Sequence, residues 1–355
     1  MPEIVLAHDY LVQFGGAERV VAHWAAAFDS RTLYTLAYSP EGTFDQFRSP
    51  EVRRSLPGSL TAQVERLLPA LPSIAARTVV TGGDIALAST SGWAHRFQFD
   101  IPHVVYVHSP ARWLYAASDY RMRLSPVRRA GLWASTPFLR YGDREAMRRA
   151  RSVMANSVVT RDRIRAAYGL EAVVVNPPVE PVAERAVRPA RHLPDAFTLC
   201  VARDRGYKNI ALAVAASKVA GLPIVVAGSG SEQLDAPDEG VYGLGRVTDS
   251  ELVWLYREAA VVIGAGREDF GLTILEAALE GTPAAVIPAG GYLETVSEGV
   301  NGFHAGSPTP EDLATAILRA REVDAASCTE WARRFRRDAH IDRIGSVLEE
   351  VVQRA

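Results

Sequence analysis

Two glutamates lie eight residues apart where a loop meets a predicted helix. Glu268 is in the loop, and Glu276 is in the opening turns of the helix predicted from Leu272 to Glu280. Helical side chains lean back toward the N-terminus, so both carboxylates could face one pocket. Carboxylates are acceptors that can bind the vicinal hydroxyls of a ribose or a hexose. The spacing also fits a solvated Glu268 and a Glu276 that complements the helix dipole, so that alternative stays open.

The elements around these glutamates follow a repeated strand, loop and helix order. The apolar run from Ala259 to Ile263 has strand composition, Gly264 and Gly266 end it, and the helix follows. A second strand, Ala284 to Ile287, leads through Gly290-Gly291 to another helix start. Consecutive units of this kind predict a parallel sheet, whose ligands lie beyond the carboxyl ends of the strands.

Two cations lie five residues apart in another strand-to-helix loop. Arg203 and Lys208 follow a predicted strand, Thr198 to Ala202, and precede a helix predicted from Ile210 to Val219. Such a pair could clamp a diphosphate and offset the charge that develops when it leaves. Arginine and lysine are common at protein surfaces, so this signal is weak when taken alone.

The first half of the chain offers polar residues at similar positions. A strand predicted from Ile4 to Ala7 is followed by His8 and Asp9, which could line the acceptor side or simply make strand-end hydrogen bonds. Gly15-Gly16 then precede a predicted helix, and glycines allow a backbone to approach a phosphate closely. A stronger strand, His103 to His108, ends with a histidine that we expect at the same sheet edge.

In register, these residues resemble the donor site of the retaining family-four glycosyltransferases of the GT-B fold. The residues that carry the resemblance are Glu268-Asp269-Phe270-Gly271, Glu276-Ala277, Gly281-Thr282-Pro283 and Gly290-Gly291 with Glu294. The resemblance implies that Glu268 and the backbone at Phe270, Gly271 and Leu272 hold the transferred sugar, and that Glu276 holds the ribose. It also places Gly290 and Gly291 on the donor side. Gly264-Ala265-Gly266 departs from the proline and serine of many relatives.

The same resemblance implies roles for residues elsewhere. Gly15 and Gly16 would face the donor diphosphate, His108 would meet the transferred sugar, and Arg203 and Lys208 would stabilise the departing diphosphate. Ala111-Arg112-Trp113 is similar to a subgroup of bacterial polysaccharide enzymes that use mannose-type donors. Arg112 is therefore expected on the acceptor side, with GDP-mannose favoured as donor and UDP-sugars second.

Fold and domain expectations follow from length, connector and resemblance. A chain of 355 residues favours two domains, and prolines between Pro177 and Pro194 indicate a stiff connector. We expect an α/β protein of the GT-B type, with two Rossmann-like domains facing across a cleft. Residues 1–180 would bind the acceptor, residues 181–330 the nucleotide sugar, and residues 331–355 would form a helix that returns to the first domain. Between Leu33 and Arg77 five prolines predict mostly loops.

Composition limits the partners and the compartment. The 39 basic and 41 acidic residues nearly cancel, which gives no indication of nucleic acid. Two distant cysteines indicate no disulfide framework and suit a reducing compartment. The start resembles a buried strand rather than a signal peptide, and no apolar run suggests a membrane span. We expect a cytoplasmic protein that could lie at the inner face of the membrane.

An arginine-rich stretch is the candidate for membrane contact. Between Arg121 and Arg151 nine arginines oppose one aspartate and one glutamate, and Leu132, Trp133 and Phe138 are interleaved with them. Such a stretch could bind a membrane surface and suit a lipid-linked acceptor. A solvated helical face is the alternative.

The predicted chemistry needs neither a metal nor a cofactor. No Asp-x-Asp motif is present, so fixed cations rather than a divalent ion would offset the diphosphate charge. We expect retaining transfer of a hexosyl group to a glycan, lipid-linked or small-molecule acceptor. A nucleotide-sugar epimerase and a catalytically inactive partner subunit of the same fold remain alternatives. A dinucleotide-binding dehydrogenase is less favoured, because no Gly-x-Gly-x-x-Gly follows the first strand.

Overall fold

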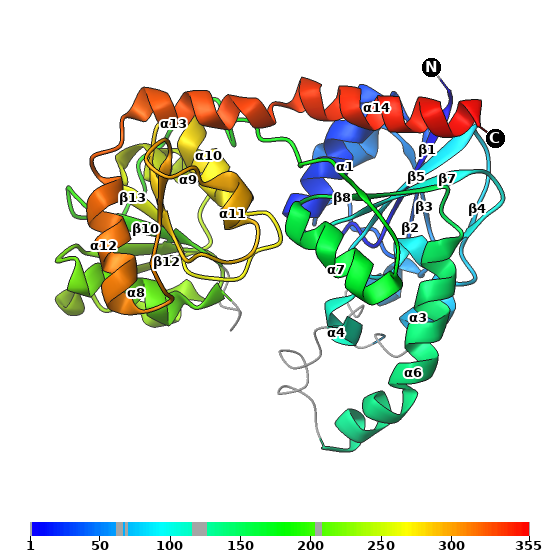
Figure 1. Ribbon diagram of the computed structural model, residues 1–355, viewed down its shortest axis with the longest axis horizontal. Coiled ribbons are helices and arrows are strands. Elements are labelled where there is room, and N and C mark those ends of the chain that lie inside the picture. Colours follow the sequence, from blue (N-terminus) through cyan, green and yellow to red (C-terminus); the bar gives the residue numbers. More distant parts are fainter. Residues whose placement is uncertain (1, 62–66, 68–69, 116–125, 203–207, 355) are drawn as a thin grey trace. The chain divides into compact units, whose positions relative to one another are not determined.

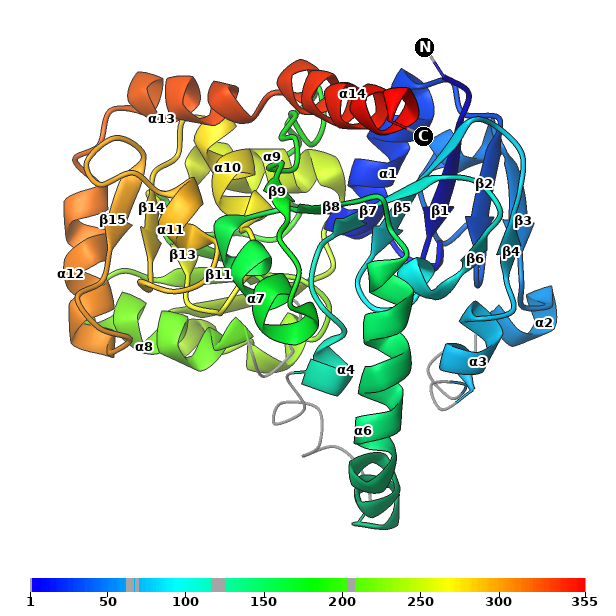
Figure 2. The ribbon, with the colours of Figure 1, turned by 45° about the vertical axis from the view of Figure 1, so that its right-hand side comes forward.

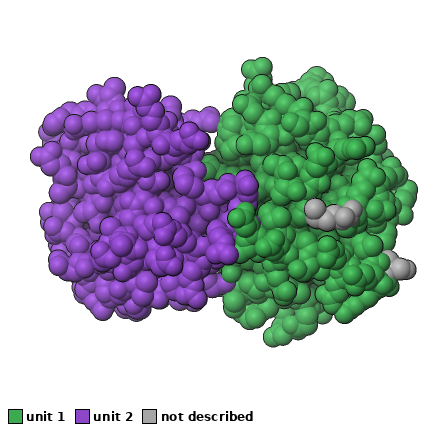
Figure 3. Space-filling model, turned by 90° about the horizontal axis from the view of Figure 1, so that it is seen from above, with its two compact units in different colours: residues 1–177, 338–355 green, residues 178–337 purple. Residues whose placement is uncertain are grey.

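The computed structural model describes residues 2–61, 67, 70–115, 126–202 and 208–354, with the backbone alone described for 126–134. It divides into two compact units (Figure 3). Unit 1 comprises residues 1–177 and 338–355, and unit 2 comprises residues 178–337. The division falls between Pro177 and Pro178, in the proline-rich connector.

Unit 1 is built on a seven-stranded parallel sheet with the order β3-β2-β1-β5-β7-β8-β9 (Figure 1). The three central strands, β1, β5 and β7, are fully buried and mostly apolar, as expected for a parallel sheet that is covered on both faces. The strands are β1 (Ile4–His8), β2 (Thr32–Thr35), β3 (Glu51–Arg54), β5 (Ile85–Thr90), β7 (His103–Val107), β8 (Ser152–Ala155) and β9 (Val173–Val174). A separate parallel ladder pairs β4 (Val79–Val80) with β6 (Gln98–Phe99).

Two apolar clusters cover the faces of this sheet. One includes Val20 and Trp24 of α1 and Leu348 of α14. The other includes Met147 of α6 and Ile164 of α7. The helical segments of unit 1 are α1 (Gly16–Ala27), η1 (Asp45–Arg48), α2 (Gly58–Thr61), α3 (Leu71–Ala75), η3 (Ala94–Arg96), α4 (Arg112–Tyr115), α6 (Pro126–Arg148), α7 (Val158–Tyr168) and most of α14 (Arg337–Gln353).

The segment from Leu33 to Arg77 is more regular than its prolines predict. It contributes most of β2 and all of β3, which form one edge of the sheet. The prediction missed β3 because its sequence, EVRR, is largely exposed and contains no apolar run. An edge strand has only one neighbour, so it can carry charged side chains that an inner strand cannot.

Residues 338–355, which include most of α14, belong to unit 1. Ile344, Leu348 and Val351 of α14 join the apolar cluster that contains Trp24. The helix expected over residues 331–355 is interrupted near its start. α13 (Ala325–Ala332) continues into η7 (Arg333–Phe335), and Arg336 then adopts an extended conformation with ψ 154° before α14 begins.

Unit 2 contains a six-stranded parallel sheet with the order β12-β11-β10-β13-β14-β15. Its strands are β10 (Thr198–Val201), β11 (Ile224–Ala227), β12 (Val241–Gly245), β13 (Val261–Gly264), β14 (Ala284–Val286) and β15 (Gly302–His304). Its helical segments are α8 (Ile210–Val219), η5 (Ser231–Leu234), η6 (Pro237–Glu239), α9 (Asp249–Glu258), α10 (Leu272–Leu279), α11 (Tyr292–Thr295), α12 (Pro310–Ala320), α13 and η7.

Each sheet has a point where the strand order reverses. In unit 1 the chain runs outward from β1 through β2 and β3 and then returns to β5 on the other side of β1. In unit 2 the chain runs from β10 through β11 and β12 and returns to β13 beside β10. Ligands of open α/β sheets bind at such switch points, beyond the carboxyl ends of the strands. The candidate residues of both units follow these strands.

Candidate active site

Lys208 and Glu268 form an ion pair at the switch point of unit 2. Lys208 follows β10 and Glu268 follows β13, and these strands are neighbours in the sheet. Both side chains are 19% exposed, so the pair is partly hydrated. The structure therefore brings together two of the residues predicted to act on the donor. Arg203 and the Asp204-Arg205-Gly206 segment lie outside the described residues.

Gly290 and Gly291 hold the backbone of the loop that carries Glu268. The amide of Gly291 donates to the carbonyl oxygen of Glu268 at 2.9 Å. Gly290 has φ +66°, and a Cβ on Gly291 would overlap the backbone of Phe270. The resemblance placed both glycines on the donor side. In the structure they pack against the loop from Glu268 to Phe270 so closely that neither position has room for a side chain.

Gly271 and Leu272 form the start of α10. Gly271 has φ +97° and precedes the first helical residue, and no side chain caps this N-terminus. The first amides of a helix and its dipole favour an anion or a hydroxyl oxygen at this end. The sequence reasoning missed Tyr292, whose ring lies 2.9 Å from where a Cβ on Gly271 would be and 2.7 Å from one on Gly264. Gly264, noted above as the end of a predicted strand and as a departure from many relatives, was the available signal.

Glu276 is half-buried on α10 and has a specific partner. The hydroxyl of Tyr256, which is buried on α9, donates to Oε2 of Glu276 at 2.9 Å. The Thr282 hydroxyl donates to the carbonyl oxygen of Tyr256. The sequence reasoning did not single out Tyr256, because a tyrosine on an apolar helical face gives no signal of this contact.

Cys200 lies on β10 near the ion pair but remains a thiol. Burial raises the pKa of this thiol to about 12, although Lys208 lowers it and Glu268 raises it further. A thiol that keeps its proton at neutral pH is a poor nucleophile.

A chain of hydrogen bonds joins three strand ends in unit 1. His8 Nδ1 lies 3.0 Å from Ser89 Oγ, and Ser89 Oγ lies 2.8 Å from His108 Nε2. These residues come from the carboxyl ends of β1, β5 and β7, and 2%, 0% and 8% of their surfaces are exposed. Burial, with smaller effects from His8 and His340, lowers the pKa of His108 to about 3. His108 is therefore neutral at physiological pH.

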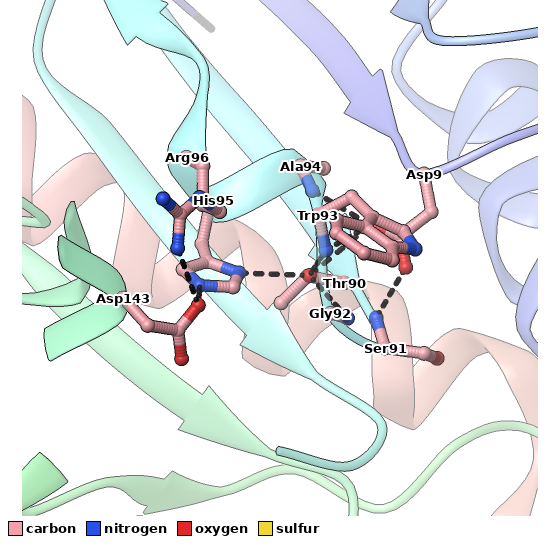
Figure 4. Close-up of polar contacts among 9 residues, drawn as sticks. All are labelled: Asp9, Thr90, Ser91, Gly92, Trp93, Ala94, His95, Arg96 and Asp143. Atoms are coloured by element: carbon pink, nitrogen blue, oxygen red, sulfur yellow. Dashed lines mark hydrogen bonds and ion pairs between the residues drawn. The ribbon is translucent and has the colours of Figure 1, made fainter. Parts of the chain in front are cut away.

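Asp9 makes the strand-end hydrogen bonds that the sequence left open as an alternative. Its buried carboxylate accepts from the amides of Ser91 at 2.6 Å, Ala94 at 2.7 Å and Trp93 at 3.1 Å, and from the Thr90 hydroxyl at 3.1 Å (Figure 4). These contacts shape the loop after β5.

The polar cluster continues from this loop to α6. His95 lies between the Thr90 hydroxyl, 3.1 Å from its Nδ1, and the Asp143 carboxylate, 2.9 Å from its Nε2 (Figure 4). Arg96 donates to the same carboxylate at 3.2 Å. The ion pairs outweigh the effect of burial, which alone would raise the pKa of Asp143, so this pKa lies below its usual range.

The remaining predicted residues of unit 1 begin helices. Gly15 precedes α1 and Gly16 is its first residue, and a Cβ on Gly15 would collide with the Glu18 carboxylate. Arg112 begins α4, where the neighbouring Trp113 stacks on Trp93 with ring centroids 5.1 Å apart.

Among the residues that the structure describes, no group of three or more His, Cys, Asp or Glu side chains could hold a metal ion. In the same part of the chain, no helix combines the length and apolar character needed to cross a membrane.

Comparison with known proteins matches both units. Residues 14–182 match the model "Glycosyltransferase Family 4", and residues 185–338 match the model "Glycosyl transferases group 1". A sucrose synthase of Thermosynechococcus vestitus is 40% identical over 77 residues, which cover 22% of this chain and 10% of that protein. A D-inositol 3-phosphate glycosyltransferase of Corynebacterium kroppenstedtii is 29% identical over 111 residues, which cover 29% of this chain and 25% of that protein. The chain thus aligns with a quarter or less of these curated relatives.

Solved structures match along nearly the whole chain. Sucrose-phosphate synthase from Thermosynechococcus elongatus gives a TM-score of 0.72 at 17% identity and covers 99% of this chain and 100% of that one. Anabaena HepE in complex with UDP gives a TM-score of 0.69 at 19% identity and covers 98% of this chain and 100% of that one. With two parallel-sheet units of the Rossmann type, the chain belongs to the family-four glycosyltransferases of the GT-B fold.

Proposed function

We propose that this chain transfers a hexosyl group from a nucleoside-diphosphate sugar to an acceptor hydroxyl and retains the anomeric configuration. The observation that carries the proposal is the Lys208–Glu268 pair at the switch point of unit 2, beside the uncapped start of α10. A cation, a carboxylate and helix amides together match a sugar diphosphate, which is anionic at one end and rich in hydroxyls at the other.

Each group has a separate role in this proposal. Lys208, with Arg203, offsets the charge on the departing diphosphate, which takes the acceptor proton on the same face of the sugar. Glu268 and the backbone from Phe270 to Leu272 hold the sugar, and Glu276 accepts from the ribose hydroxyls. Gly15, Gly16 and His108 contribute from unit 1. The reaction uses no metal or cofactor.

Two separate observations support two candidate donors. The sequence from His108 to Arg112 favours GDP-mannose, because it is similar to enzymes that use mannose-type donors. Crystal structures of HepE contain UDP and UDP-glucose, which supports uridine nucleotides as the second candidate. The acceptor is a glycan, a lipid-linked sugar or a small molecule.

The first test is the thermal shift produced by GDP, UDP, ADP and dTDP, each with and without EDTA. A ligand that binds only the folded chain raises its stability according to its affinity. A shift that is selective for GDP and insensitive to EDTA supports the metal-free mannosyl donor, and a shift with UDP alone replaces the donor but keeps the reaction. No shift with any of the four contradicts donor binding and favours an inactive partner subunit.

A second test separates transfer from epimerisation. The chain is incubated with the donor that gave the shift, with and without a panel of sugar acceptors, and the products are separated by mass and anomeric configuration. A new glycoside of retained configuration supports transfer. An epimer of the donor formed without an acceptor assigns the chain to a nucleotide-sugar epimerase instead.

We also propose that α6 contacts the inner face of the cytoplasmic membrane. Phe138 and Tyr141, one helical turn apart, are 79% and 67% exposed, and α6 extends from the sheet of unit 1 (Figure 2). Arg140 and Arg144 are used within the unit, because they donate to the carbonyl oxygens of Leu114 and Ala167. Arg121 and Arg123 lie outside the described residues, and only backbone is described at Leu132 and Trp133.

Binding to vesicles tests this membrane proposal. The chain should sediment with vesicles that contain anionic lipid but not with neutral vesicles, and the Phe138→Ser, Tyr141→Ser double variant should lose this binding. Equal binding of the variant and the wild type would contradict it. The exposed Val219 of unit 2, replaced by serine, is the control for a lost apolar side chain.

A further inference from the structure

Unit 1 has a pocket at the amino-terminal edge of its sheet. Its volume is about 630 Å³, and sites for small ligands usually measure about 300 to 1,000 Å³. Residues 97–103 and 148–151 line it, beside β6 and at the amino ends of β7 and β8. His108 follows the other end of β7, five residues of extended strand or about 16 Å away from His103. A ligand in this pocket would therefore lie apart from the hydrogen-bond chain at the carboxyl ends of the strands.

Three arginines give this pocket a positive charge. Arg148 ends α6, and Arg149 and Arg151 lie between α6 and β8. The lining contains one acidic residue, Asp100. Arg148 donates to Glu145 at 2.6 Å in an exposed pair, a kind of contact that contributes little to stability. In the part of the chain that the structure describes, no carboxylate pairs with Arg149 or Arg151, and both residues are exposed, so their guanidinium groups are accessible to an anion.

His103, which also lines the pocket, has a buried nitrogen without a partner. The residue is 6% exposed, and none of the described residues forms a hydrogen bond with its Nε2. The ring of Phe99 stacks on the imidazole with ring centroids 4.1 Å apart. The amide of Arg151 donates to the carbonyl oxygen of His103 at 2.9 Å, which holds the two residues side by side. A buried polar atom without a hydrogen bond is costly, and a polar group of a ligand would satisfy it.

The imidazole of His103 adds no charge to the pocket at neutral pH. Burial is the main cause that lowers the pKa of His103 to about 4, and the charges of Arg149 and Arg151 act in the same direction. A hydrogen bond with the backbone of Ile101 acts in the opposite direction. The positive charge therefore comes from the arginines, and the imidazole can bond a polar group as a neutral ring.

Two simpler roles do not account for all of these features. Arginines at the end of a helix offset its dipole, which explains Arg148 but neither the pocket nor the unpaired nitrogen of His103. A membrane surface is bound by exposed apolar side chains, whereas Phe97 of this pocket is 2% exposed. A small anionic ligand fits the pocket, the arginines and the histidine together.

We propose that this pocket binds a small phosphate ester, with the phosphate on Arg149 and Arg151 and the organic part against His103 and Phe99. Guanidinium groups match phosphate because they can donate two parallel hydrogen bonds to its oxygens. Apolar walls with a few polar groups are typical of sites that hold the organic part of a ligand. The site lies within unit 1, is distinct from the Lys208–Glu268 pair, and does not depend on the proposed function.

The first experiment is calorimetric titration of the full chain with glucose 6-phosphate, phenyl phosphate, inorganic phosphate and glucose. At least one of the two esters should bind more tightly than inorganic phosphate, and glucose should not bind. The Arg149→Ala, Arg151→Ala double variant should bind that ester at least about tenfold more weakly, because charge-assisted hydrogen bonds are lost. Both side chains are exposed, so this variant should fold like the wild type.

Two controls place the ester in this pocket. The Arg161→Ala, Arg165→Ala double variant removes the same charge from exposed pairs on α7 and should bind the ester like the wild type. Lys208→Ala should also keep ester binding, because Lys208 belongs to unit 2. Equal affinity in the two arginine double variants, loss of binding in Lys208→Ala, ester binding no tighter than that of inorganic phosphate, or no binding of either ester overturns the proposal.

The second experiment observes the histidine directly. The chain is labelled with ¹⁵N-histidine, and His103→Gln and His108→Gln variants assign the two rings. The His103 signals should move when the ester is added, whereas those of His108, beyond the other end of β7, should stay in place. His103 signals that stay unchanged while the ester binds would show that the ester lies elsewhere.

Vesicles distinguish a free phosphate ester from a lipid surface. Wild type and the Arg149→Ala, Arg151→Ala variant are sedimented with vesicles that contain anionic lipid, and the same preparations are titrated with the two esters. Ester binding that is lost in the variant supports the proposal. Vesicle binding that requires these two arginines, without binding of either ester, would assign them to a membrane surface and overturn it.

Discussion

The two units place polar groups at the same topological position, but these groups differ in their exposure to water. In unit 2, Lys208 and Glu268 follow neighbouring strands at the switch point and are each 19% exposed. In unit 1, His8 and Ser89 lie at the carboxyl ends of neighbouring strands at the corresponding point and are 2% and 0% exposed. One site is a partly hydrated ion pair, and the other is a buried hydrogen-bond chain.

Electrostatics explains why the two sites differ. A buried charge is costly unless it is paired and hydrogen-bonded, whereas a buried neutral network that is fully satisfied costs little and fixes orientation. Unit 2 keeps its charges partly hydrated, so under the proposed function an incoming diphosphate would replace Glu268 as the partner of Lys208. Unit 1 keeps its polar groups buried and joined by hydrogen bonds. From this comparison we expect unit 2 to provide the charge that stabilises the diphosphate, and unit 1 to provide polar groups that are held in place by buried hydrogen bonds.

The largest effect should come from removing the cation of unit 2. Lys208→Ala should lower kcat/KM for transfer by about 100-fold to 1,000-fold, the range seen when a preorganised group that stabilises developing charge is lost. Steady-state kinetics with the identified donor measure it. Lys218→Ala, an exposed lysine near the end of α8, should be unchanged. Wild-type turnover in Lys208→Ala would mean that unit 2 does not provide the charge.

Asp143 tests the rule for buried charge within unit 1. Its side chain is 0% exposed and is paired with His95 and Arg96. Asp143→Asn should destabilise the chain at pH 7 by about 3 to 5 kcal/mol, because it leaves buried partners unpaired. The control, Asp162→Asn, alters an exposed pair and should cost at most about 1 kcal/mol.

The same variant should change the pH dependence of stability. The pKa of Asp143 is lower in the folded chain than in the unfolded one, so its contribution is present above its ordinary pKa and is lost as pH falls through the folded value. Thermal unfolding temperatures of wild type and Asp143→Asn should therefore differ by a constant amount above the ordinary pKa of an aspartate, about 4, and should converge only as the pH falls below it. A difference that stays constant below that pH would show that Asp143 acts only by packing.

Gly291 tests whether backbone packing shapes the site of unit 2. A Cβ there would overlap the Phe270 backbone, so Gly291→Ala should destabilise unit 2 by about 1 to 3 kcal/mol, and it should also weaken nucleotide binding by moving the Glu268 loop. Gly345→Ala is the control. Apart from the neighbouring residues and the backbone of its own helix, nothing lies within 4 Å of the added methyl group, and α14 should gain up to about 1 kcal/mol. Equal melting temperatures for the two variants would contradict this role for Gly291.

The sequence predicted the parts of the molecule that local patterns encode. The strand, glycine loop and helix order from Ala259 to Gly291 predicted parallel strands, and the structure confirms β13 and β14 as neighbours. The approach of Lys208 to Glu268 was not predictable from spacing, because it depends on the pairing of β10 with β13 across 60 residues of chain.

Other parts could not be derived from local patterns. β3 carries charged side chains on a sheet edge, so it lacks the apolar run that identifies inner strands. The contacts of Asp9 with the loop after β5 join residues more than 80 positions apart. From its place after a predicted strand, Asp9 could equally have lined the acceptor side or made strand-end hydrogen bonds. Sequence patterns located the strand ends, and the strand order determined which side chains meet there.

The smallest effect should come from the hydroxyl that orients Glu276. Tyr256→Phe removes one hydrogen bond of 2.9 Å and leaves the buried ring in place, so nucleotide affinity should fall by about 0.5 to 1.5 kcal/mol. Calorimetric titration measures the loss, and Tyr38→Phe, which removes a tyrosine hydrogen bond in unit 1, should leave the affinity unchanged. Unchanged affinity in Tyr256→Phe would mean that Glu276 needs no fixed orientation to accept from a ribose. A loss confined to Tyr256→Phe would show that unit 2 also uses a buried hydroxyl to orient a charged group. The two units would then differ only in how far their polar groups are exposed to water.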